Sequence, residues 1–183
     1  LTCATLSEDT LEQALFGIEA MKSHPRRIGV LEEAHGGTLL LDEVADMDMA
    51  TQLKMVRVLH NRRFQRIGGD TVVEVNSRVL ATTTRDLTAL IAEGKFREDL
   101  FYRLNVVPIH APPLSDRRED IPLLAVHLME RSAAAKSRSP RILGADALTA
   151  LQGHDWPGNV WELSNVMERL LLMAPGGSQD HIH

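Results

Sequence analysis

A short apolar run that ends in two adjacent carboxylates limits the fold of this chain more than any other feature. Two glycines precede Thr38-Leu39-Leu40-Leu41, and Asp42-Glu43 follow the run directly. Such a run, without alternation of polar and apolar side chains, is typical of a strand buried in a parallel sheet. Ligands bind open α/β sheets at the carboxyl ends of the strands, and the two acids fall at that end.

The two adjacent acids suit the chemistry of a magnesium-bound nucleotide. Asp42 could hold the magnesium ion, usually through water, and Glu43 could orient or deprotonate an attacking water. The alternative is a strand followed by a solvated acidic turn that continues through Asp46 and Asp48. Because short motifs also arise by chance, both interpretations stay open on this stretch alone.

Strands and helices alternate along the first part of the chain, and helices alone follow the break in composition at Pro112-Pro113. Apolar spacing and turn residues define these elements. The predicted elements are, in chain order, a helix from the N-cap Ser7 to Gly17, a helix over Met49–Leu59, a hairpin over Phe64–Val75, a buried strand over Val79–Thr83, a short helix capped by Asp86, a helix over Phe96–Leu104, an edge strand over Val106–Ile109, and helices over Ile121–Ser137, Ala145–Gln152 and Asn159–Met173. This order predicts an α/β body followed by a small helical bundle.

Composition and charge narrow the class of protein. Of the 183 residues, 44% are hydrophobic and 25% are charged, which is ordinary for a globular chain with a core. The net charge of −5 makes the chain as a whole a poor binder of nucleic acid. The single cysteine, Cys3, excludes an internal disulfide and fits a reducing cytosol, so a cytoplasmic location is expected.

The sequence supports neither a membrane-spanning segment nor a histidine metal site. No apolar run approaches the length of a membrane span, so no membrane partner is expected. The histidines are scattered without the spacing of metal ligands. The chain begins with Leu1 rather than Met, which indicates an excerpt of a longer protein.

A second segment with chemical potential runs from Gly94 to Leu104. Arg97 and Arg103 lie six residues apart on the predicted helix. Two arginines held by a helix can reach a phosphate on a neighbouring subunit, as arginine fingers do. The alternative is pairing within the helix, for example of Asp99 with Arg103. On this segment alone, pairing within the helix is the better supported interpretation, because charged helix faces are common.

Three segments together resemble the AAA+ central domain of NtrC-type, sigma-54-dependent transcription regulators. The third segment is Trp156-Pro157-Gly158-Asn159-Val160, in which Pro-Gly marks a turn and Asn159 can cap the last helix. The resemblance also rests on Leu15-Phe16-Gly17, Arg57-Val58-Leu59, Gly68-Gly69, Pro112-Pro113-Leu114 and Arg117-Arg118-Glu119-Asp120-Ile121. These phrases span nearly the whole chain in one order, which makes the combination specific.

The resemblance implies a fold and its division. The fold would be an α/β, AAA+ P-loop NTPase-type parallel sheet without its N-terminal part, followed by a small all-α lid. Residues 1–114 would form the partial core, residues 115–175 the lid and residues 176–183 a flexible tail. Without the upstream strand and P-loop helix of the family, apolar surface of the sheet should be exposed.

The resemblance also implies ATP and Mg²⁺ as cofactors and assigns roles to particular residues. Asp42 becomes the magnesium-side acid of the Walker B strand, and Glu43 becomes the catalytic carboxylate. Arg97 and Arg103 match the two arginine-finger positions of the family. In the family these arginines act across the subunit interface of a ring, usually a hexamer.

The chain departs from the family pattern in two loops. The phosphate-cradling Gly-x-x-x-x-Gly-Lys-Ser/Thr loop lies upstream of residue 1 in the family, so this piece is not expected to bind or hydrolyse ATP well by itself. The GAFTGA loop that contacts sigma-54 should follow Leu15-Phe16-Gly17. Residues 18–29 are short and lack that motif, which resembles the NtrX-like branch.

Single positions depart as well. Trp161 replaces the sensor II arginine of the lid, and an indole offers no charged fork to a phosphate. Thr84 stands where sensor I often has Asn or His, and Thr2 stands where an Asn usually partners the Walker B glutamate. A hydroxyl still forms hydrogen bonds and an indole can stack, so Thr84 and Trp161 are expected to contact the nucleotide.

Two functions stay open. In the first, the chain is the ATPase domain of a bacterial sigma-54-type response regulator, which controls transcription through nucleotide-dependent oligomerisation. In the alternative, favoured by the missing GAFTGA loop and by Trp161, it is a non-hydrolysing AAA+ scaffold or interaction module that acts without sigma-54. The expected partners are further copies in a ring, RNA polymerase holoenzyme, and DNA through another domain of the parent.

Overall fold

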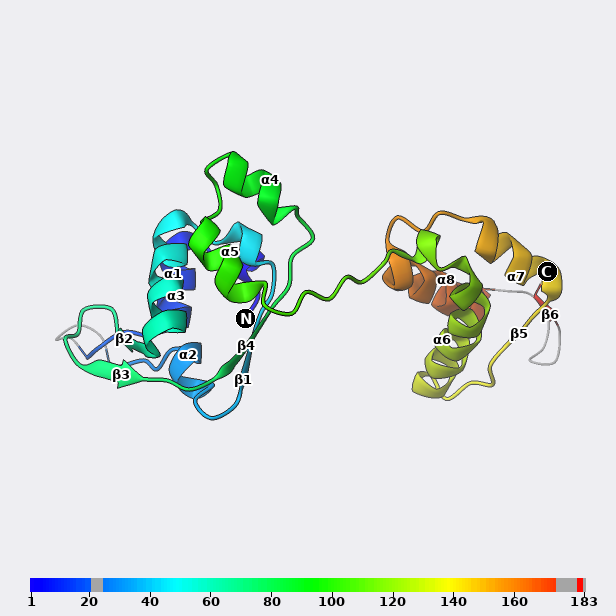
Figure 1. The fold of residues 1–183 in the computed structure, drawn as a ribbon. Coiled ribbons are helices and arrows are strands. Elements are labelled where there is room, and N and C mark those ends of the chain that lie inside the picture. Colours follow the sequence, from blue (N-terminus) through cyan, green and yellow to red (C-terminus); the bar gives the residue numbers. More distant parts are fainter. Residues whose placement is uncertain (21–24, 174–180, 183) are drawn as a thin grey trace. The chain divides into compact units, whose positions relative to one another are not determined.

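The computed structural model describes residues 1–20, 25–173 and 181–182. The chain divides into two compact units, Leu1–Pro108 and Ile109–His183 (Figure 1). Strands and helices alternate in the first unit, and helices dominate the second. Each unit has its own cluster of buried apolar side chains. The predicted order of an α/β body and a helical unit is therefore confirmed.

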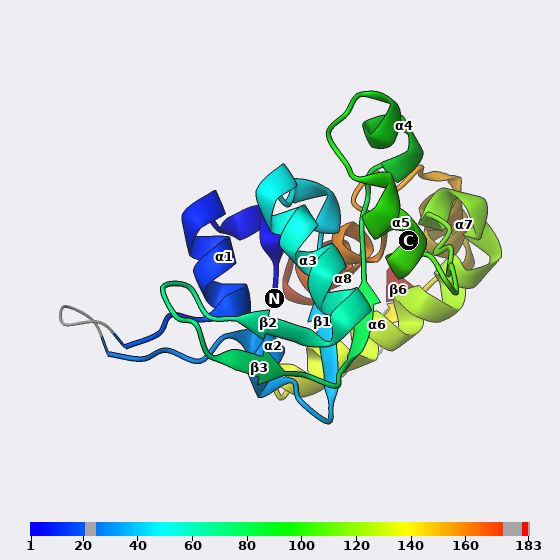
Figure 2. The same cartoon turned by 60° about the vertical axis from the view of Figure 1, so that its left-hand side comes forward.

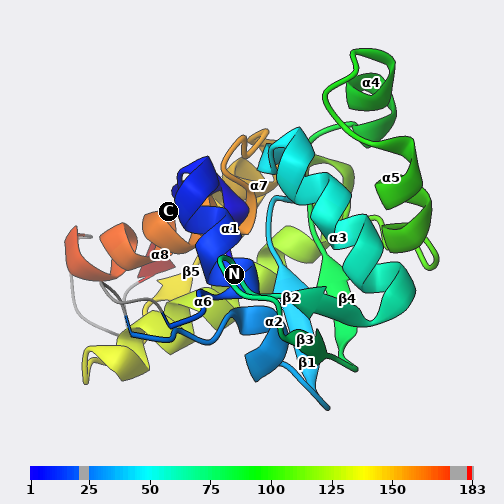
Figure 3. The same cartoon turned by 90° about the vertical axis from the view of Figure 1, so that its left-hand side faces the viewer.

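Two parallel strands form the sheet that carries the acids. β1 (Thr38–Leu41) pairs with β4 (Arg78–Ala81), and the two strands lie side by side (Figure 3). Leu41 is opposite Ala81, so both strands end at the same edge. The apolar run is therefore a strand of a parallel sheet, as its composition predicts. The strand predicted over Val79–Thr83 covers Arg78–Ala81, and its predicted burial is wrong, because Leu80 and Ala81 are exposed.

The two faces of this sheet differ in burial. Leu39 and Leu41 are buried in the core of the first unit. Leu40 and its partner Leu80 are 47% and 45% exposed. The face that carries Leu40 and Leu80 is thus open within the described unit, and the expectation of exposed apolar surface is confirmed.

Helices cover the buried side of the sheet. α1 (Glu8–Phe16) and α3 (Met49–Asn61) lie side by side (Figure 2), and α2 (Val30–Glu33) packs beside α1. Short 3-10 turns, η1 (Cys3–Thr5) and η2 (Val44–Asp46), lead into α1 and α3.

α3 begins where its cap residue requires. The Asp48 carboxylate accepts the backbone N–H groups of Ala50 and Thr51, both at 2.9 Å. These are amides that have no partner inside a helix, and an acid at this position satisfies them. The predicted helix is confirmed and continues two residues beyond Leu59.

The predicted hairpin is present as β2 (Arg63–Gln65) and β3 (Val72–Glu74), which pair antiparallel. Phe64 points into the core, and its ring meets the Phe16 ring edge-on at 5.7 Å. This contact joins the hairpin to the end of α1.

The segment after the sheet differs from the prediction at both ends. α4 (Leu87–Ala92) is capped by Asp86 as expected, and α5 covers Glu98–Leu104. The predicted start at Phe96 is wrong, because Arg97 is extended. The predicted strand over Val106–Ile109 is also absent, since no described strand lies beside these residues to pair with them.

The second unit is a small helical bundle. Its elements are η3 (Leu114–Asp116), η4 (Arg118–Asp120), α6 (Ile121–Ala135), β5 (Ile142–Leu143), α7 (Ala145–Gly153), α8 (Asn159–Met173) and β6 (His181–Ile182). α6 packs along α8, and β5 pairs parallel with β6. The tail expected over residues 176–183 falls mostly outside the described residues, and β6 is the part of it that the structure describes. No helix in the described ranges is long and apolar enough to cross a membrane.

Candidate functional site

The carboxylate of Asp42 lies between two threonine hydroxyls at the end of β1. The Thr82 hydroxyl donates to Asp42 Oδ1 at 2.6 Å, and the Thr2 hydroxyl donates to Oδ2 at 3.4 Å. The Asp42 backbone is fixed as well, because its N–H donates to the Leu1 carbonyl and its own carbonyl accepts from Cys3, both at 2.8 Å. Residues 1–3 on one side of β1 and Thr82 on the other side therefore orient this acid.

The Glu43 side chain points to a different hydroxyl. Its backbone is left-handed, with φ 56° and ψ 58°, a conformation that costs a non-glycine residue on the order of 1 kcal/mol. The Glu43 Oε2 atom accepts the Thr84 backbone N–H at 3.0 Å and the Thr84 hydroxyl at 3.3 Å. Thr84 is thus in contact with the predicted catalytic acid, at the end of the neighbouring chain segment.

The hydroxyls are distributed differently from what the family pattern suggests. Thr2 was expected beside Glu43, but it contacts Asp42, and Glu43 contacts Thr84. Thr82 did not stand out in the sequence. It follows Ala81, which is opposite Leu41, so the strand register places Thr82 opposite Asp42. Only the register of the two strands could have revealed it.

The neighbouring acids of the turn, Asp46 and Asp48, already interact with other parts of the protein. Asp46 pairs with Arg85 at 3.0 Å, and Asp48 caps α3. By contrast, Asp42 and Glu43 form no ion pair with any residue in the part of the chain that the structure describes. The simple acidic-turn interpretation therefore accounts for Asp46 and Asp48 but not for Asp42 and Glu43.

The donor set around Asp42 fits a magnesium ion of the kind that nucleotides carry. Magnesium is usually bound through one or two carboxylates, water and substrate phosphates rather than by a cage of protein ligands. Among the described residues no group of three or more His, Cys, Asp or Glu side chains is placed to hold a metal. A half-buried carboxylate flanked by hydroxyls offers only the oxygen ligands that magnesium prefers.

Arg97 lies just before α5 and is engaged locally. Its guanidinium meets both oxygens of Asp99, with Nε–Oδ1 at 3.0 Å and Nη2–Oδ2 at 2.8 Å. This hydrogen bond lowers the pKa of Asp99 and raises that of Arg97. The pairing expected between Asp99 and Arg103 is not the one observed, since Arg103 contacts His60 on α3.

A buried glutamine sets the position of Arg97. The Gln52 amide nitrogen donates to the Met47 carbonyl at 2.7 Å and to the Lys95 carbonyl at 3.1 Å. Its oxygen accepts the Arg97 backbone N–H at 2.8 Å. Gln52 is fully buried, so it joins α3 to the start of α5. Nothing in the local sequence pattern identified it.

The lid positions also differ from expectation. Trp161 on α8 is 77% exposed and packs on no core. Asn159 is the first residue of α8, and its side chain accepts the Leu114 backbone N–H at 2.7 Å rather than capping its own helix. Trp156 is buried, and its indole N–H donates to the Leu151 carbonyl at 2.7 Å.

The stretch after α1, where the family has its GAFTGA loop, is held at both ends. Ile18 pairs with Arg27 and with Ile67 of the hairpin turn. A Cβ on Gly17 would lie 2.4 Å from the Arg27 carbonyl oxygen, and one on Gly29 would lie 2.3 Å from that of Leu15. Residues 21–24 lie outside the described residues.

One arginine ties this stretch to the hairpin. Arg66 is 6% exposed and donates twice to the Glu32 carboxylate, at 3.0 and 2.8 Å. It also donates to Glu19 at 2.8 Å. The hydrogen bond from Arg66 lowers the pKa of Glu32. This ion cluster of Arg66, Glu19 and Glu32 joins three segments that are far apart in the sequence.

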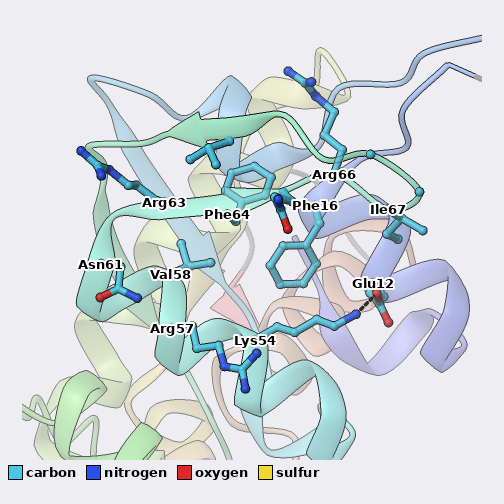
Figure 4. A pocket seen from close by; sticks show the side chains of 14 residues that line it. Glu12, Phe16, Lys54, Arg57, Val58, Asn61, Arg63, Phe64, Arg66 and Ile67 are labelled. Atoms are coloured by element: carbon cyan, nitrogen blue, oxygen red, sulfur yellow. Dashed lines mark hydrogen bonds and ion pairs between the residues drawn. The ribbon is translucent and has the colours of Figure 1, made fainter.

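A cavity of about 790 Å³ lies between α1, the second half of α3 and the hairpin. Figure 4 shows the Phe16 and Phe64 rings at its centre and the Lys54–Glu12 ion pair at one side, below the rings. None of the predicted site residues lines it. The carboxylates lie before α3, whereas this cavity is beside the later turns of that helix, so it is separate from the candidate site.

The comparisons with known proteins agree with this geometry. A family model described as "Sigma-54 interaction domain" matches residues 1–110, and one described as "AAA+ ATPase lid domain" matches residues 115–182. The nitrogen assimilation regulatory protein NtrX of Azorhizobium caulinodans is 48% identical over 180 residues, which are 98% of this chain and 39% of that protein. The regulatory protein AtoC of Escherichia coli is 46% identical over 179 residues, which are 96% of this chain and 39% of that protein.

Solved structures give the same result. A crystal structure of NtrX from Brucella abortus matches with a TM-score of 0.92 at 46% identity, over 100% of this chain and 42% of that one. A crystal structure of the same protein in complex with ATP matches with a TM-score of 0.91 at 46% identity, over 98% and 39%. The chain spans about two fifths of the length of these relatives. It therefore belongs to the AAA+ sigma-54 interaction domain family of NtrC-type transcription regulators, with its α/β part and its lid.

Proposed function

We propose that this chain is the ATPase and lid region of a sigma-54-type response regulator. The observation that carries the proposal is the state of Asp42 and Glu43. Both acids lie at the carboxyl end of β1, both are oriented by hydroxyls, and neither is neutralised by a described cation. Acids oriented in this way and left unpaired are available to a hydrated metal ion or to an attacking water. The crystal structure of Brucella abortus NtrX in complex with ATP supports a nucleotide as the ligand.

The two acids divide the work in this proposal. Asp42 would hold magnesium through its water shell, and the bound ion would neutralise charge on the phosphates. Glu43 would leave Thr84 and accept a hydrogen bond, and then a proton, from the attacking water. Thr84 is positioned to keep the Glu43 carboxylate at the edge of the site until that exchange.

The arginines would act between copies of the protein. Arg97 and Arg103 would each reach a phosphate bound to a neighbouring subunit of a ring. Arg97 would then exchange Asp99 for the phosphate, since its guanidinium now meets that carboxylate. Contacts with RNA polymerase holoenzyme, and with DNA through another domain of the parent in the cytoplasm, complete this proposal.

A second candidate is a scaffold that keeps the fold without hydrolysis. Trp161 is 77% exposed at the position where the family has its sensor II arginine. The stretch in place of the GAFTGA loop is held to the hairpin by Arg66. Both observations favour a regulator that oligomerises without remodelling sigma-54 polymerase.

Steady-state ATP turnover by the full-length protein separates the two candidates. Glu43→Gln should lower the turnover at least about a hundredfold, because it removes the general base. Asp46→Asn is the matched control, since this acid belongs to the same turn but pairs with Arg85. Turnover that survives in the control and vanishes in Glu43→Gln supports the ATPase. Wild-type turnover no higher than that of Glu43→Gln supports the scaffold.

A further inference from the structure

One hydroxyl joins the two acids of the site. Thr82 Oγ1 lies 2.6 Å from Asp42 Oδ1 and 3.3 Å from the Glu43 backbone nitrogen. An ionised carboxylate can only accept and a backbone N–H can only donate. The Thr82 hydroxyl therefore donates its proton to Asp42 and accepts the N–H of Glu43, so both contacts set its rotor.

The backbone of Thr82 reinforces the same turn. Its N–H donates to the Leu41 carbonyl at 2.9 Å, and its carbonyl accepts the Val44 N–H at 3.0 Å. Thr82 thus contacts every residue from Leu41 to Val44 on the neighbouring strand end. Its side-chain contacts lie on the two acids, and its backbone contacts lie on the residues that flank them.

The hydroxyls of Thr2 and Thr83 hold the two acids less firmly than the Thr82 hydroxyl does. Thr2 reaches Asp42 from the opposite side at 3.4 Å, which is long for a hydrogen bond between oxygens. The Thr83 hydroxyl contacts only the backbone of Arg85. The short contact to Asp42 and the contact to the Glu43 backbone are thus both made by Thr82.

We infer that Thr82 is a positioning residue that couples the metal-side acid to the catalytic acid. Its hydroxyl fixes the rotation of the Asp42 carboxylate by holding Oδ1, the oxygen that Thr2 does not contact. The same hydroxyl holds the left-handed turn at Glu43, which directs that side chain toward Thr84. This inference rests on the proposed nucleotide site and adds a residue that the family motifs do not identify in this chain.

Two replacements of Thr82 test the inference in the full-length protein. Thr82→Val keeps the shape of the side chain and removes the hydroxyl, whereas Thr82→Ser keeps the hydroxyl. Thr83→Val is the matched control on the next residue. Thr82 is exposed, so neither replacement opens a cavity in the core. Melting temperatures of all variants should stay close to that of the wild type.

The first readout is equilibrium binding of a fluorescent ATP analogue at increasing Mg²⁺ concentration. Thr82→Val should raise the Mg²⁺ concentration for half-saturation by about five- to tenfold, the net value of one ordinary hydrogen bond, because this site is exposed to water. Thr82→Ser should stay within about twofold of the wild type, and Thr83→Val should match it. The affinity for the ATP analogue in EDTA should be unchanged, whereas a general structural defect would lower it.

The second readout needs no nucleotide. Amide hydrogen exchange at Glu43 should accelerate about tenfold in Thr82→Val, because the N–H loses its acceptor, while the Val44 amide keeps its carbonyl acceptor and its rate. An unchanged Glu43 rate overturns the inference, and so does wild-type Mg²⁺ dependence in Thr82→Val. If the wild type binds no nucleotide, the proposed function fails, and the exchange rates still decide whether Thr82 holds the turn.

Discussion

Replacement of Arg66 by Met should destabilise the first unit far more than an equivalent replacement on the same hairpin. Met keeps most of the apolar stem of arginine and removes the guanidinium. Arg66 is 6% exposed and makes two hydrogen bonds to Glu32, whose side chain is 22% exposed. Loss of one partner from a buried ion pair costs about 3–5 kcal/mol. Because Glu32 keeps some contact with water, we expect Arg66→Met to lower the free energy of unfolding by a smaller amount, about 2–3 kcal/mol.

The matched control is Arg63→Met. Arg63 pairs with Glu74 at 2.7 Å across the hairpin, but the two side chains are 62% and 68% exposed. Exposed ion pairs contribute about 0–1 kcal/mol, so this change should lower the free energy of unfolding by less than about 0.5 kcal/mol. Urea unfolding of both variants at pH 7, followed by circular dichroism, gives the comparison.

The difference in the free energy of unfolding between the wild type and Arg66→Met should also depend on pH. Arg66 lowers the pKa of Glu32 below its ordinary value of 4.5. A lowered folded-state pKa gives stability that is present above the unfolded pKa and is lost as the pH falls through the folded pKa. The difference in stability between wild type and Arg66→Met should therefore narrow as the pH falls below the ordinary Glu pKa of 4.5. Equal losses in the two variants, or a gap that widens in acid, would refute the reasoning.

The remaining predictions concern burial. Gln52→Leu should cost about 2–4 kcal/mol, because it leaves the buried Met47 carbonyl and the partly buried Lys95 carbonyl and Arg97 N–H without their partner, and a thermal melt like that of the wild type would contradict it. Burial raises the pKa of the Cys3 thiol to about 11, so iodoacetamide should modify Cys3 at pH 8 only after urea is added, and rapid modification of the native chain would show that the thiol is open. The isolated chain should bind a hydrophobic dye and unfold at a modest temperature, because it exposes Leu40, Leu80, Val106, Val107 and Ile109, and a sharp melt at high temperature without dye binding would oppose this.

Local patterns predicted the elements whose causes are local. The α3 helix follows from its apolar stripe and the cap at Asp48, and the hairpin follows from its turn glycines. The parallel strand β1 followed from its continuous apolar run. In each case residues close in the sequence determine the backbone conformation, so a single sequence suffices.

The contacts between distant residues could not be read in the same way. Thr82 contacts an acid 40 residues away, and Arg66 contacts one 47 residues away. Such pairs depend on strand register and on helix packing, which leave no periodic signal. Arg97 shows the opposite error, because a helix was expected there on its composition, and a hydrogen bond from its backbone to Gln52 holds it extended.

The close approach of Gly17 and Gly29 makes the stretch between them an exchangeable module. A Cβ added at either glycine would lie only 2.3–2.4 Å from a backbone oxygen at the other end of the stretch, so the two ends touch. A loop whose ends are already joined can change length at little cost, since each doubling adds only about 0.6 kcal/mol of closure entropy. α1 and α2 would keep their places whether the loop between them is short or long. A domain of this kind can therefore gain or lose loop residues at this point while the rest of the fold, and the acids at the end of β1, stay the same.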